Sequence, residues 1–384
     1  MRIAIFDYRV VPTNPVGSCH LRMLAGLSAE HEFTVFAVQF ENPAPDRIRW
    51  VRIRLPMRPH AVLYFLFHLI APLTYVFHRL KTRTRFDLVQ FVESNLMFGD
   101  VAYSHFCHRS YLRFHRPKGI AGFRGLARLI SHRMSALMEP RTYRRVRHLV
   151  VPSRGLVGEI SAEYKRQPSS MFLMPNPVDV ERMRMPADFD RDTARRSHGF
   201  SSEDVVLLFV ALGHFERKGL PLLLDAMRRI PDSPIHLTVV GGTKDTVAQW
   251  RRHADEAGLR GKVSFAGMHR DIRRYLWIAD IFVLPSHYEV FPLVTLEAAA
   301  AGLPLLVTRL NGVEEFLKSG VNGFLVDRTA ASIANVLSRL PAMTAQLREM
   351  GRNAQQDVQR YATRHFIARW REFYDTYCVL ARAA

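Results

Sequence analysis

Uniformly apolar, strand-like runs alternate with helical stretches along the 384 residues, and they do so in two separate series. The second series is the clearer one, with runs at residues 205–212, 235–242, 262–267, 280–285 and 303–308. Strands that are apolar on both faces and are separated by helices are typical of a parallel sheet covered on both sides. The pattern therefore predicts an α/β unit with a doubly wound sheet.

The first series has the same character. Its strands are expected at residues 2–7, 31–40, 48–53, 87–92, 101–105 and 148–152, with an arginine-rich helix near 127–145. Segment 174–183 separates the two series, because Pro175 and Pro177 prevent a helix there. The chain is thus predicted to form two doubly wound, Rossmann-like domains, 1–176 and 177–362, that face each other across a cleft. Ligands of such sheets bind at the carboxyl ends of the strands.

One segment of the second series, residues 286–308, combines two carboxylates with the start of a helix. Glu289 precedes the helix, and Glu297 lies within it, roughly 6–9 Å farther along the axis. The helix is expected to begin just after Glu289, which leaves free backbone N–H groups along Val290–Val294. Such a helix end binds anions, for example a diphosphate. A pair of unrelated surface glutamates is the alternative.

Residues 286–308 resemble the E-x7-E motif of the retaining glycosyltransferases of family 4, which have the GT-B fold. Glu289 and Glu297 stand at the two glutamate positions of that motif. The match extends to Phe291, Ala298, Gly302, Leu303 and Pro304. The resemblance implies that Glu289 contacts hydroxyl groups of the donor sugar and that Glu297 binds the ribose of the nucleotide. Val290 departs from the family, which usually has a glycine there, a residue that lets the backbone approach a ligand closely.

A pair of cations follows the first strand of the second series. Arg217 and Lys218 lie between strand 205–212 and a helix, where two positive charges can neutralise a diphosphate leaving group. A solvated charge pair at a helix start is the alternative. The segment resembles the phosphate loop of the family, with His214 in the place where many members have Arg. With this pair present, neither a metal nor a cofactor is expected beside a nucleotide diphosphate-sugar as the donor.

The first domain carries weaker signals. The loop at residues 14–18 is expected to face the cleft, and its Gly17 resembles part of the glycine-rich loop of the family. The family often has a histidine after a strand near 101–105, bonded to the donor sugar or the acceptor. We favour His105 over His108 for this position, because His105 ends the apolar strand; a structural histidine is the alternative for either.

The strand ends at 239–242 and 265–272 lie around the nucleobase in the family, although ordinary strand-to-helix turns explain them equally well. The predicted site comprises Arg217, Lys218, Glu289 and His105 as catalytic residues, and Gly17, Gly241, Met268, Arg270, Val290, Phe291, Pro292, Leu293, Val294 and Glu297 as donor-binding residues.

Positive charge is concentrated in the first half of the chain. Residues 1–170 contain 26 Lys and Arg against 11 Asp and Glu, within a net charge of +19. Such an excess suits an anionic partner, or is no more than a soluble, arginine-rich surface. Residues 61–77 are strongly apolar, and the basic segment 78–85 follows, which favours insertion into one leaflet of an anionic membrane. The run is shorter than the ~20 residues of a spanning helix, and a buried helix is the alternative.

The resemblance implies transfer of a hexose, with retention and without a metal, from a nucleotide diphosphate-sugar to a cell-envelope glycan, lipopolysaccharide-type or lipid-linked acceptor. It also implies that the amphipathic helix at 363–384 packs back on the first domain. We expect a cytoplasmic enzyme that is peripheral on the inner face of the membrane, because the chain starts with a strand rather than a signal peptide. No nucleic acid partner is expected. A non-catalytic membrane-associated GT-B scaffold and a GT-B-fold epimerase are the alternatives.

Overall fold

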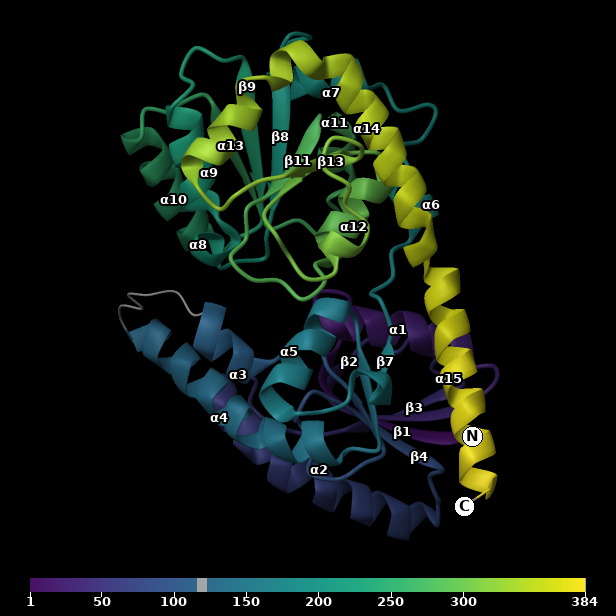
Figure 1. Ribbon diagram of the computed structural model, residues 1–384. Helices are drawn as coiled ribbons and strands as arrows, with labels where there is room; N and C mark the ends of the chain where they lie inside the picture. The colour runs from purple at the N-terminus through teal and green to yellow at the C-terminus, as the bar shows by residue number, and fades with distance from the viewer. Residues whose placement is uncertain (116–122, 384) are drawn as a thin grey trace. The chain divides into compact units, whose positions relative to one another are not determined.

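The computed structural model describes residues 1–115 and 123–383. They divide into two compact units. The first unit consists of Met1–Asn176 together with Thr363–Ala384, and the second unit is Pro177–Ala362. Figure 1 shows the helices and strands of each unit.

The first unit is built on a parallel sheet of seven strands in the order β3-β2-β1-β4-β5-β6-β7. The strands are β1 (Arg2–Val10), β2 (Glu32–Phe40), β3 (Ile48–Arg52), β4 (Leu88–Val92), β5 (Val101–Tyr103), β6 (His148–Val151) and β7 (Met171–Leu173). The chain runs from β1 outward to β3 and then returns to place β4 on the other side of β1. The topological switch point of this sheet therefore lies between β1 and β4.

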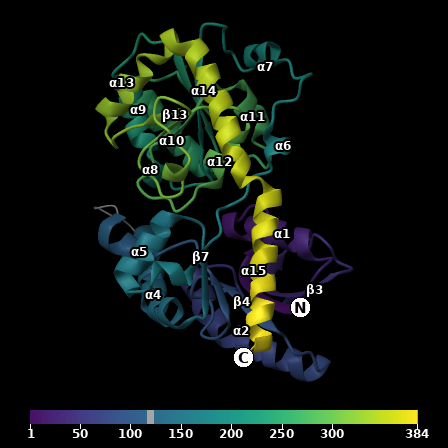
Figure 2. The ribbon, with the colours of Figure 1, turned by 45° about the vertical axis from the view of Figure 1, so that its right-hand side comes forward.

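Helices cover this sheet and connect its strands. They are α1 (Pro15–Leu27), α2 (His60–Thr82), α3 (His108–Ser110), a π-helix at Tyr111–His115, α4 (Phe123–Arg145), α5 (Arg154–Tyr164), a 3-10 turn at Pro168–Ser170 and α15 (Thr363–Ala383). Helix α15 runs alongside α1, as Figures 1 and 2 both show, although more than 300 residues of chain separate the two.

The second unit repeats this plan with six parallel strands in the order β10-β9-β8-β11-β12-β13. They are β8 (Val205–Val210), β9 (Ile235–Val240), β10 (Val263–Gly267), β11 (Ile281–Leu284), β12 (Leu305–Val307) and β13 (Gly323–Leu325). The switch point of this sheet lies between β8 and β11. Both sheets are doubly wound and parallel, as the sequence predicts.

The helices of the second unit are mostly short. They are α6 (Val180–Met183), α7 (Arg191–Ser197), α8 (Phe215–Lys218), α9 (Leu220–Arg228), α10 (Lys244–Glu256), α11 (Arg273–Ile278), α12 (Leu293–Ala300), α13 (Ala330–Leu337) and α14 (Thr344–Asp357), with 3-10 turns at Val313–Glu315, Leu340–Met343 and Val358–Tyr361.

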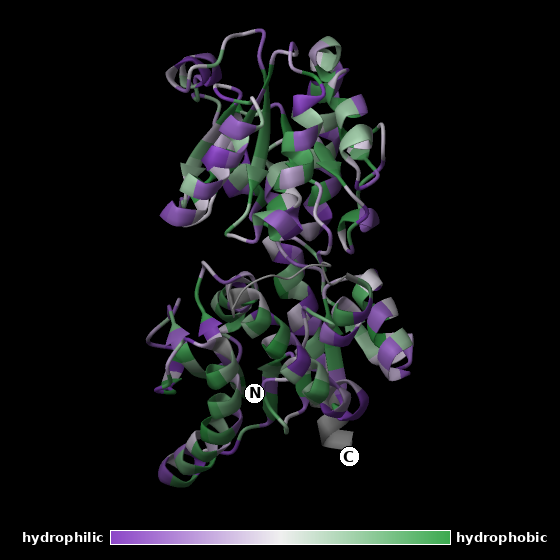
Figure 3. Cartoon of the chain, turned by 90° about the vertical axis from the view of Figure 1, so that its left-hand side faces the viewer, coloured by the Kyte–Doolittle hydropathy of each residue, from purple (hydrophilic) through white to green (hydrophobic). Residues whose placement is uncertain are grey.

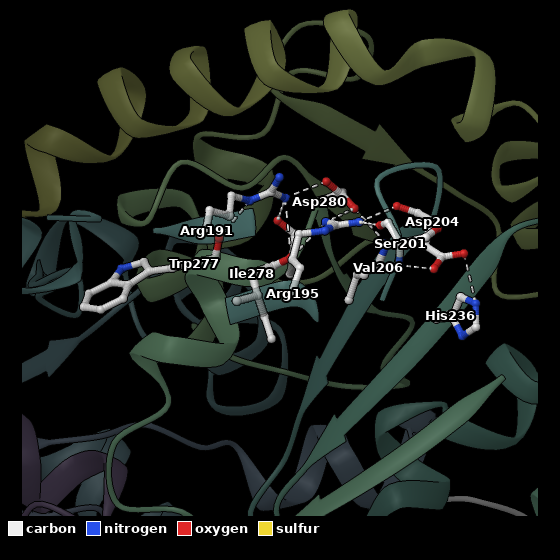
Figure 4. A network of polar contacts seen from close by, with 10 residues as sticks. Arg191, Arg195, Ser201, Asp204, Val206, His236, Trp277, Ile278 and Asp280 are labelled. Atoms are coloured by element: carbon white, nitrogen blue, oxygen red, sulfur yellow. Dashed lines mark hydrogen bonds and ion pairs between the residues drawn. The ribbon is translucent and has the colours of Figure 1, made fainter. Parts of the chain in front are cut away.

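A network of charged groups stabilises the amino edge of the second sheet (Figure 4). Asp280, directly before β11, binds Arg191 at 2.6 Å and the buried Arg195 at 2.9 Å. Asp204, directly before β8, pairs with His236 at 3.2 Å. These contacts hold α7 against the strand starts. Because ligands bind at the opposite, carboxyl edge of such sheets, we assign this network a structural role.

Helix α2 presents a large apolar surface that the rest of the first unit does not cover. The apolar stretch continues as helix through the basic residues, so that Ala61–Thr82 is 22 residues long and could cross a membrane by length and composition alone. The 17-residue run read from the sequence is therefore too short an estimate. Its most exposed apolar side chains are Phe65, Leu69, Leu73, Val76, Phe77 and Leu80.

Little of the apolar surface of α2 is buried by the rest of the protein. Only 28% of its most apolar 18-residue window is buried, so α2 is not the buried core helix that the sequence left open. In Figure 3 it is largely hydrophobic, with a hydrophilic last turn. That turn contains Arg79 and Lys81. Helix α4 contacts α2 and adds the exposed side chains of Leu126, Ile130 and Leu137.

Buried polar groups attach α15 to the first sheet. The Tyr374 hydroxyl donates to Oε1 of Gln90 at 2.8 Å, and Nε2 of Gln90 lies 3.1 Å from Nε2 of His20. Nδ1 of His20 contacts Asp7 at 3.1 Å. All four side chains are buried. The chain of bonds therefore joins α15 to β4, α1 and β1.

We expect Tyr374→Phe to lower the free energy of unfolding by about 1–3 kcal/mol, because it leaves the buried oxygen of Gln90 without its donor. Urea denaturation measures this change. Arg371→Ala is the matched control, since it removes a partly exposed ion pair between α15 and Glu30 and should cost no more than about 1 kcal/mol. Equal losses in the two variants would contradict the role of the buried bond.

Candidate functional site

The carboxyl ends of β8 and β11 meet at the switch point of the second sheet, and the predicted charged residues lie there. Helix α8 follows β8 and ends with Arg217 and Lys218. The loop after β11 carries Glu289. Nζ of Lys218 lies 2.6 Å from Oε1 of Glu289, and Nη1 of Arg217 lies 3.4 Å from the same oxygen. The structure thus brings Glu289 to two cations that lie 71 and 72 positions before it in sequence.

Further hydrogen bonds fix this cluster. Nη1 of Arg217 donates to the carbonyl of Tyr288 at 2.6 Å, and the Ser286 hydroxyl donates to Glu289 at 2.8 Å. The N–H of His287 donates to the carbonyl of Arg217 at 2.8 Å. The two loops are therefore bonded to each other through backbone as well as side chains. Ser286 is not among the predicted site residues, and its only signal in the sequence is its place in the loop after a buried strand.

Burial makes the electrostatics of the cluster strong. Burial alone would raise the pKa of Glu289, but Lys218 and Arg217 outweigh it, and the pKa is lowered. Burial lowers the pKa of Lys218, Arg217 adds to this effect, and Glu289 opposes it. Two cations against one carboxylate leave an excess of positive charge. Such a site favours an anionic ligand.

Gly219 allows the two loops to approach. It has a φ of 89° and lies between α8 and α9. A Cβ atom at this position would lie 2.1 Å from the carbonyl oxygen of Pro285, which directly follows β11. A side chain there would therefore push α8 away from the β11 loop, and Arg217 and Lys218 with it.

The start of α12 corrects one prediction. The helix begins at Leu293, with Pro292 as its N-cap residue, and not directly after Glu289. The free N–H groups of the first turn are thus offered from Leu293 and Val294 onward, while Val290 and Phe291 precede the helix and are buried. The reason is packing, because the ring of Phe291 lies against Gly312 and Tyr361. Glu297 lies in α12 and is partly buried.

Val290 replaces the glycine of the family without backbone strain. It is not among the non-glycine residues with positive φ, which in the described part of the chain are Arg83, Glu93, Lys165 and His214. The conformational freedom of glycine is therefore not needed at this position. The side chain of Val290 is buried instead.

The weaker predictions have mixed outcomes. Gly241 has a φ of 113°, and a Cβ there would lie 1.8 Å from the carbonyl oxygen of Ala211. Close contact between the ends of β8 and β9 is thus a sufficient reason for this glycine. Met268 and Arg270 are exposed at the carboxyl end of β10. Their positions follow the predicted strand end, and their exposure leaves them available to a ligand.

Gly17 does not lie in a loop, contrary to the prediction. Helix α1 already begins at Pro15, and Asn14 caps it by accepting a hydrogen bond from the N–H of Gly17 at 2.8 Å. A Cβ on Gly17 would lie 2.2 Å from the carbonyl oxygen of Arg9. The glycine therefore lets the first turn of α1 pack against the end of β1. Asn14 followed by Pro15 was the signal of a helix start that the sequence analysis overlooked.

The two candidate histidines have different environments in the first unit. Nε2 of His105 contacts Oδ1 of Asn176 at 3.0 Å, and its Nδ1 has no hydrogen-bond partner among the described residues. Burial lowers the pKa of His105 to about 4, so the ring is neutral at pH 7. His105 lies two residues beyond Tyr103, where β5 ends, rather than at the strand end itself. His108 is the first residue of α3 and contacts Glu93 and His132.

Among the described residues, no group of three or more His, Cys, Asp or Glu side chains has an arrangement that could hold a metal ion. An Asp-x-Asp pattern does occur at residues 188–192. There Asp190 accepts a hydrogen bond from the N–H of Thr193 at 2.9 Å and caps α7. That pattern belongs to a helix start at the amino edge of the sheet.

Models of known protein families match both units. The model "Glycosyl transferases group 1" matches residues 190–357, and the model "Glycosyltransferase Family 4" matches residues 17–182. The chain belongs to glycosyltransferase family 4 and has the GT-B fold. It is therefore a glycosyltransferase, as the E-x7-E segment predicted.

Two curated relatives show how far this likeness extends. The family 4 glycosyltransferase is 27% identical to an uncharacterized glycosyltransferase of Methanocaldococcus jannaschii over 88% of its own chain and 89% of the relative. It is 36% identical to the lipopolysaccharide core biosynthesis glycosyltransferase LpsE of Rhizobium meliloti, over 31% of this chain and 34% of LpsE. The second match thus spans only about a third of that relative.

Solved structures share the fold at low sequence identity. Sucrose-phosphate synthase from Thermosynechococcus elongatus has a TM-score of 0.80 and 19% identity over all of both chains. Anabaena HepE in complex with UDP-glucose has a TM-score of 0.73 and 18% identity, over 98% of this chain and 100% of HepE. These likenesses concern the fold alone.

We expect Gly219→Ala to destabilise the glycosyltransferase by about 2–4 kcal/mol, because it combines a positive φ with a clash against Pro285. Gly258→Ala is the matched control, since Gly258 has a φ of 74° and open space around its Cβ position. The control should lose only the cost of the backbone conformation, about 1 kcal/mol. Urea unfolding compares the two, and equal losses would show that the approach to Pro285 has no effect.

Proposed function

We propose that the enzyme transfers a hexose, with retention of the anomeric configuration and without a metal, from a nucleotide diphosphate-sugar to a cell-envelope glycan or lipid-linked acceptor. The observation that carries this proposal is the buried cluster of Arg217, Lys218 and Glu289 at the switch point of the second sheet. It combines excess positive charge for a diphosphate with a carboxylate for sugar hydroxyl groups.

The cations act on the leaving group. As the bond between the sugar and the diphosphate breaks, negative charge develops on the phosphate oxygen. Arg217 and Lys218 stabilise that charge, and the N–H groups at the start of α12, from Leu293 and Val294 onward, add to it. Because the site excludes much of the solvent, these interactions are stronger than they would be in water.

The carboxylates orient the donor. Glu289 accepts hydrogen bonds from hydroxyl groups of the sugar, and Glu297 accepts them from the ribose. The exposed Met268 and Arg270 and the backbone at Gly241 are the neighbours of the base. Anabaena HepE, which has the same fold, was solved with UDP-glucose. That complex supports a nucleotide-sugar as donor.

Retention follows in this scheme from attack on the same face of the sugar from which the diphosphate leaves. We assign no side chain to attack the anomeric carbon. The acceptor hydroxyl instead attacks the anomeric carbon from the face from which the diphosphate leaves. An oxygen of the diphosphate takes the proton of that hydroxyl. One bond from the sugar to oxygen breaks, another forms on the same face, and the charges balance.

The first unit is assigned to the acceptor. His105 is neutral, and the buried Nδ1 atom without a described partner is suited to accept a hydrogen bond from a sugar hydroxyl. The match to LpsE, a lipopolysaccharide core biosynthesis enzyme, supports an envelope acceptor. Such acceptors lie at a membrane, which suits the apolar surface of α2.

We place the enzyme at the inner face of the cytoplasmic membrane. The exposed apolar side chains of α2 provide the part that enters the lipid, and Arg79 and Lys81 in its last turn provide attraction to anionic headgroups. The positive excess of residues 1–170 adds to that attraction. An unbound α2 would otherwise expose an unusually large apolar patch to water.

Incubation of the protein with a panel of nucleotide-sugars and envelope extract should release nucleoside diphosphate with at least one donor.

With that donor, Lys218→Gln should lower kcat about 10²–10³-fold, because a stabilising charge at the leaving group is lost. Glu297→Gln should instead raise the dissociation constant of the nucleotide about 10- to 100-fold. Lys318→Gln, a change at an exposed lysine paired with Asp357, is the control and should match wild type. No release with any donor would refute the proposed function.

The protein should sediment with vesicles that contain anionic lipid, and more weakly at high salt. Replacing Leu73, Phe77 and Leu80 together by Gln should lower binding about 100-fold or more, because each side chain contributes about 1.5–3 kcal/mol when buried in lipid. The matched control replaces Met185 and Val321, two exposed apolar residues of the second unit, by Gln. Binding that is the same in both variants would rule out α2 as the membrane contact.

A further inference from the structure

A second cluster of titratable side chains lies at the carboxyl ends of β4 and β5, beside the switch point of the first sheet. Glu93 follows β4 directly, His108 begins α3, and His132 lies in α4. Nε2 of His108 lies 3.6 Å from Oε2 of Glu93, and Nδ1 of His108 lies 2.9 Å from Nδ1 of His132. Since the two Nδ1 atoms share one proton, one ring donates and the other accepts.

The backbone conformation of Glu93 is strained, and this strain points to a function. Glu93 has a φ of 51°. Two of the other three non-glycine residues with positive φ in the described chain, Arg83 and Lys165, end helices, where this conformation is routine. Glu93 ends a strand, and such strain persists where the surroundings fix a residue for a purpose. A π-helix, Tyr111–His115, directly follows α3, and such helices are frequent at functional sites.

The surroundings hold His108 in place. The buried carboxylate of Glu139 accepts hydrogen bonds from the backbone N–H groups of His108 and Arg109 and from the hydroxyl of Tyr164. Burial opposes protonation of His108, but Glu93 and Glu139 outweigh it and raise the pKa of His108. His108 is thus fixed by its backbone, and its ring is directed to Glu93.

Donor groups accompany the carboxylate. The hydroxyls of Tyr8 in β1 and Tyr64 in α2 lie near Glu93, and burial, together with the charge of Glu93, raises the pKa of Tyr64 to about 12 and that of Tyr8 well above its usual range. Both hydroxyls therefore keep their protons. The Tyr64 hydroxyl also contacts that of Ser94 at 3.0 Å. Hydroxyl donors beside a carboxylate acceptor are the mixture that binds sugar hydroxyls.

Both sheets have a glutamate paired with a basic side chain beside their switch point. In the second unit, Glu289 follows the strand across the switch point from β8 and is paired with Lys218. In the first unit, Glu93 follows the strand across the switch point from β1 and is paired with His108. The carboxyl edge at a switch point is where ligands of doubly wound sheets bind.

We infer that Glu93 is an acceptor-binding residue, which accepts hydrogen bonds from neutral sugar hydroxyls of the glycan, and that His108 and His132 are positioning residues that hold its carboxylate. The inference rests on the proposed function of the first unit. We assign neutral hydroxyl groups rather than a phosphate to this subsite, because the carboxylate of Glu93 would repel a phosphate.

Kinetics test the inference. With the donor identified by the screen and solubilised envelope extract as acceptor, Glu93→Gln should lower kcat/KM for the acceptor about 10- to 100-fold and leave the KM of the donor unchanged. Glu41→Gln is the matched control, because Glu41 follows β2 at the same edge of the sheet, is exposed and lies away from the switch point. His108→Gln should also raise the acceptor KM and not the donor KM. Wild-type acceptor kinetics in Glu93→Gln would overturn the inference.

A second measurement does not depend on turnover, so the failure of the inference is distinguishable from failure of the proposed function. The imidazole resonances of His108 and His132 are followed by NMR during addition of methyl α-D-glucopyranoside, methyl α-D-mannopyranoside or methyl α-D-galactopyranoside. At least one glycoside should shift them in wild type and none in Glu93→Gln, and inorganic phosphate should shift them in neither. No shift with any glycoside, or a shift with phosphate, would refute a neutral sugar subsite.

Discussion

The ion pair between Lys218 and Glu289 is the contact on which the carboxyl edge of the second sheet depends. It joins the loop after β8 to the loop after β11 at 2.6 Å, and Arg217 bonds to both the carbonyl of Tyr288 and the carboxylate. Removing one partner of a buried pair leaves the other charge uncompensated, which is costly. The pair therefore orders both loops without a ligand, and the excess charge of Arg217 remains to attract an anion.

Close backbone contact makes that ion pair possible. Gly219 brings α8 against Pro285, and Gly241 brings the end of β9 against Ala211. The charged cluster and its glycine neighbours thus form one rigid corner of the second sheet. A polar network on the amino edge, around Asp280, stabilises the same strands from the other end without occupying the ligand-binding edge.

Much of the fold could be predicted from the sequence, because apolar runs such as 205–210 are short, are rich in valine and alternate with helical stretches, which is typical of buried parallel strands. The edge strands β7 and β13 could not be predicted, since each has only three residues and no distinct pattern.

Within the candidate site, the position of Arg217, Lys218 and Glu289 followed from strand order. The start of α12 did not, because the packing of Phe291 on Gly312 and Tyr361, which keeps the chain extended up to Pro292, is a tertiary contact. Glu93 was missed for the same reason: its partner His108 follows a different strand, 15 positions along the chain, and nothing local marks the pair.

Each sheet has one non-glycine residue in a strained backbone conformation beside its switch point. Arg83 and Lys165 adopt positive φ at helix ends, where the conformation satisfies the last carbonyls. The remaining two described non-glycine residues of this kind are His214, four residues after β8 ends, and Glu93, directly after β4. Each lies beside the switch point of its own sheet. Since such a conformation costs of order 1–3 kcal/mol, and both units place it at the edge where ligands bind, the strain is more readily explained by recognition than by folding. Both units thus place a strained residue at the corresponding edge of their sheet.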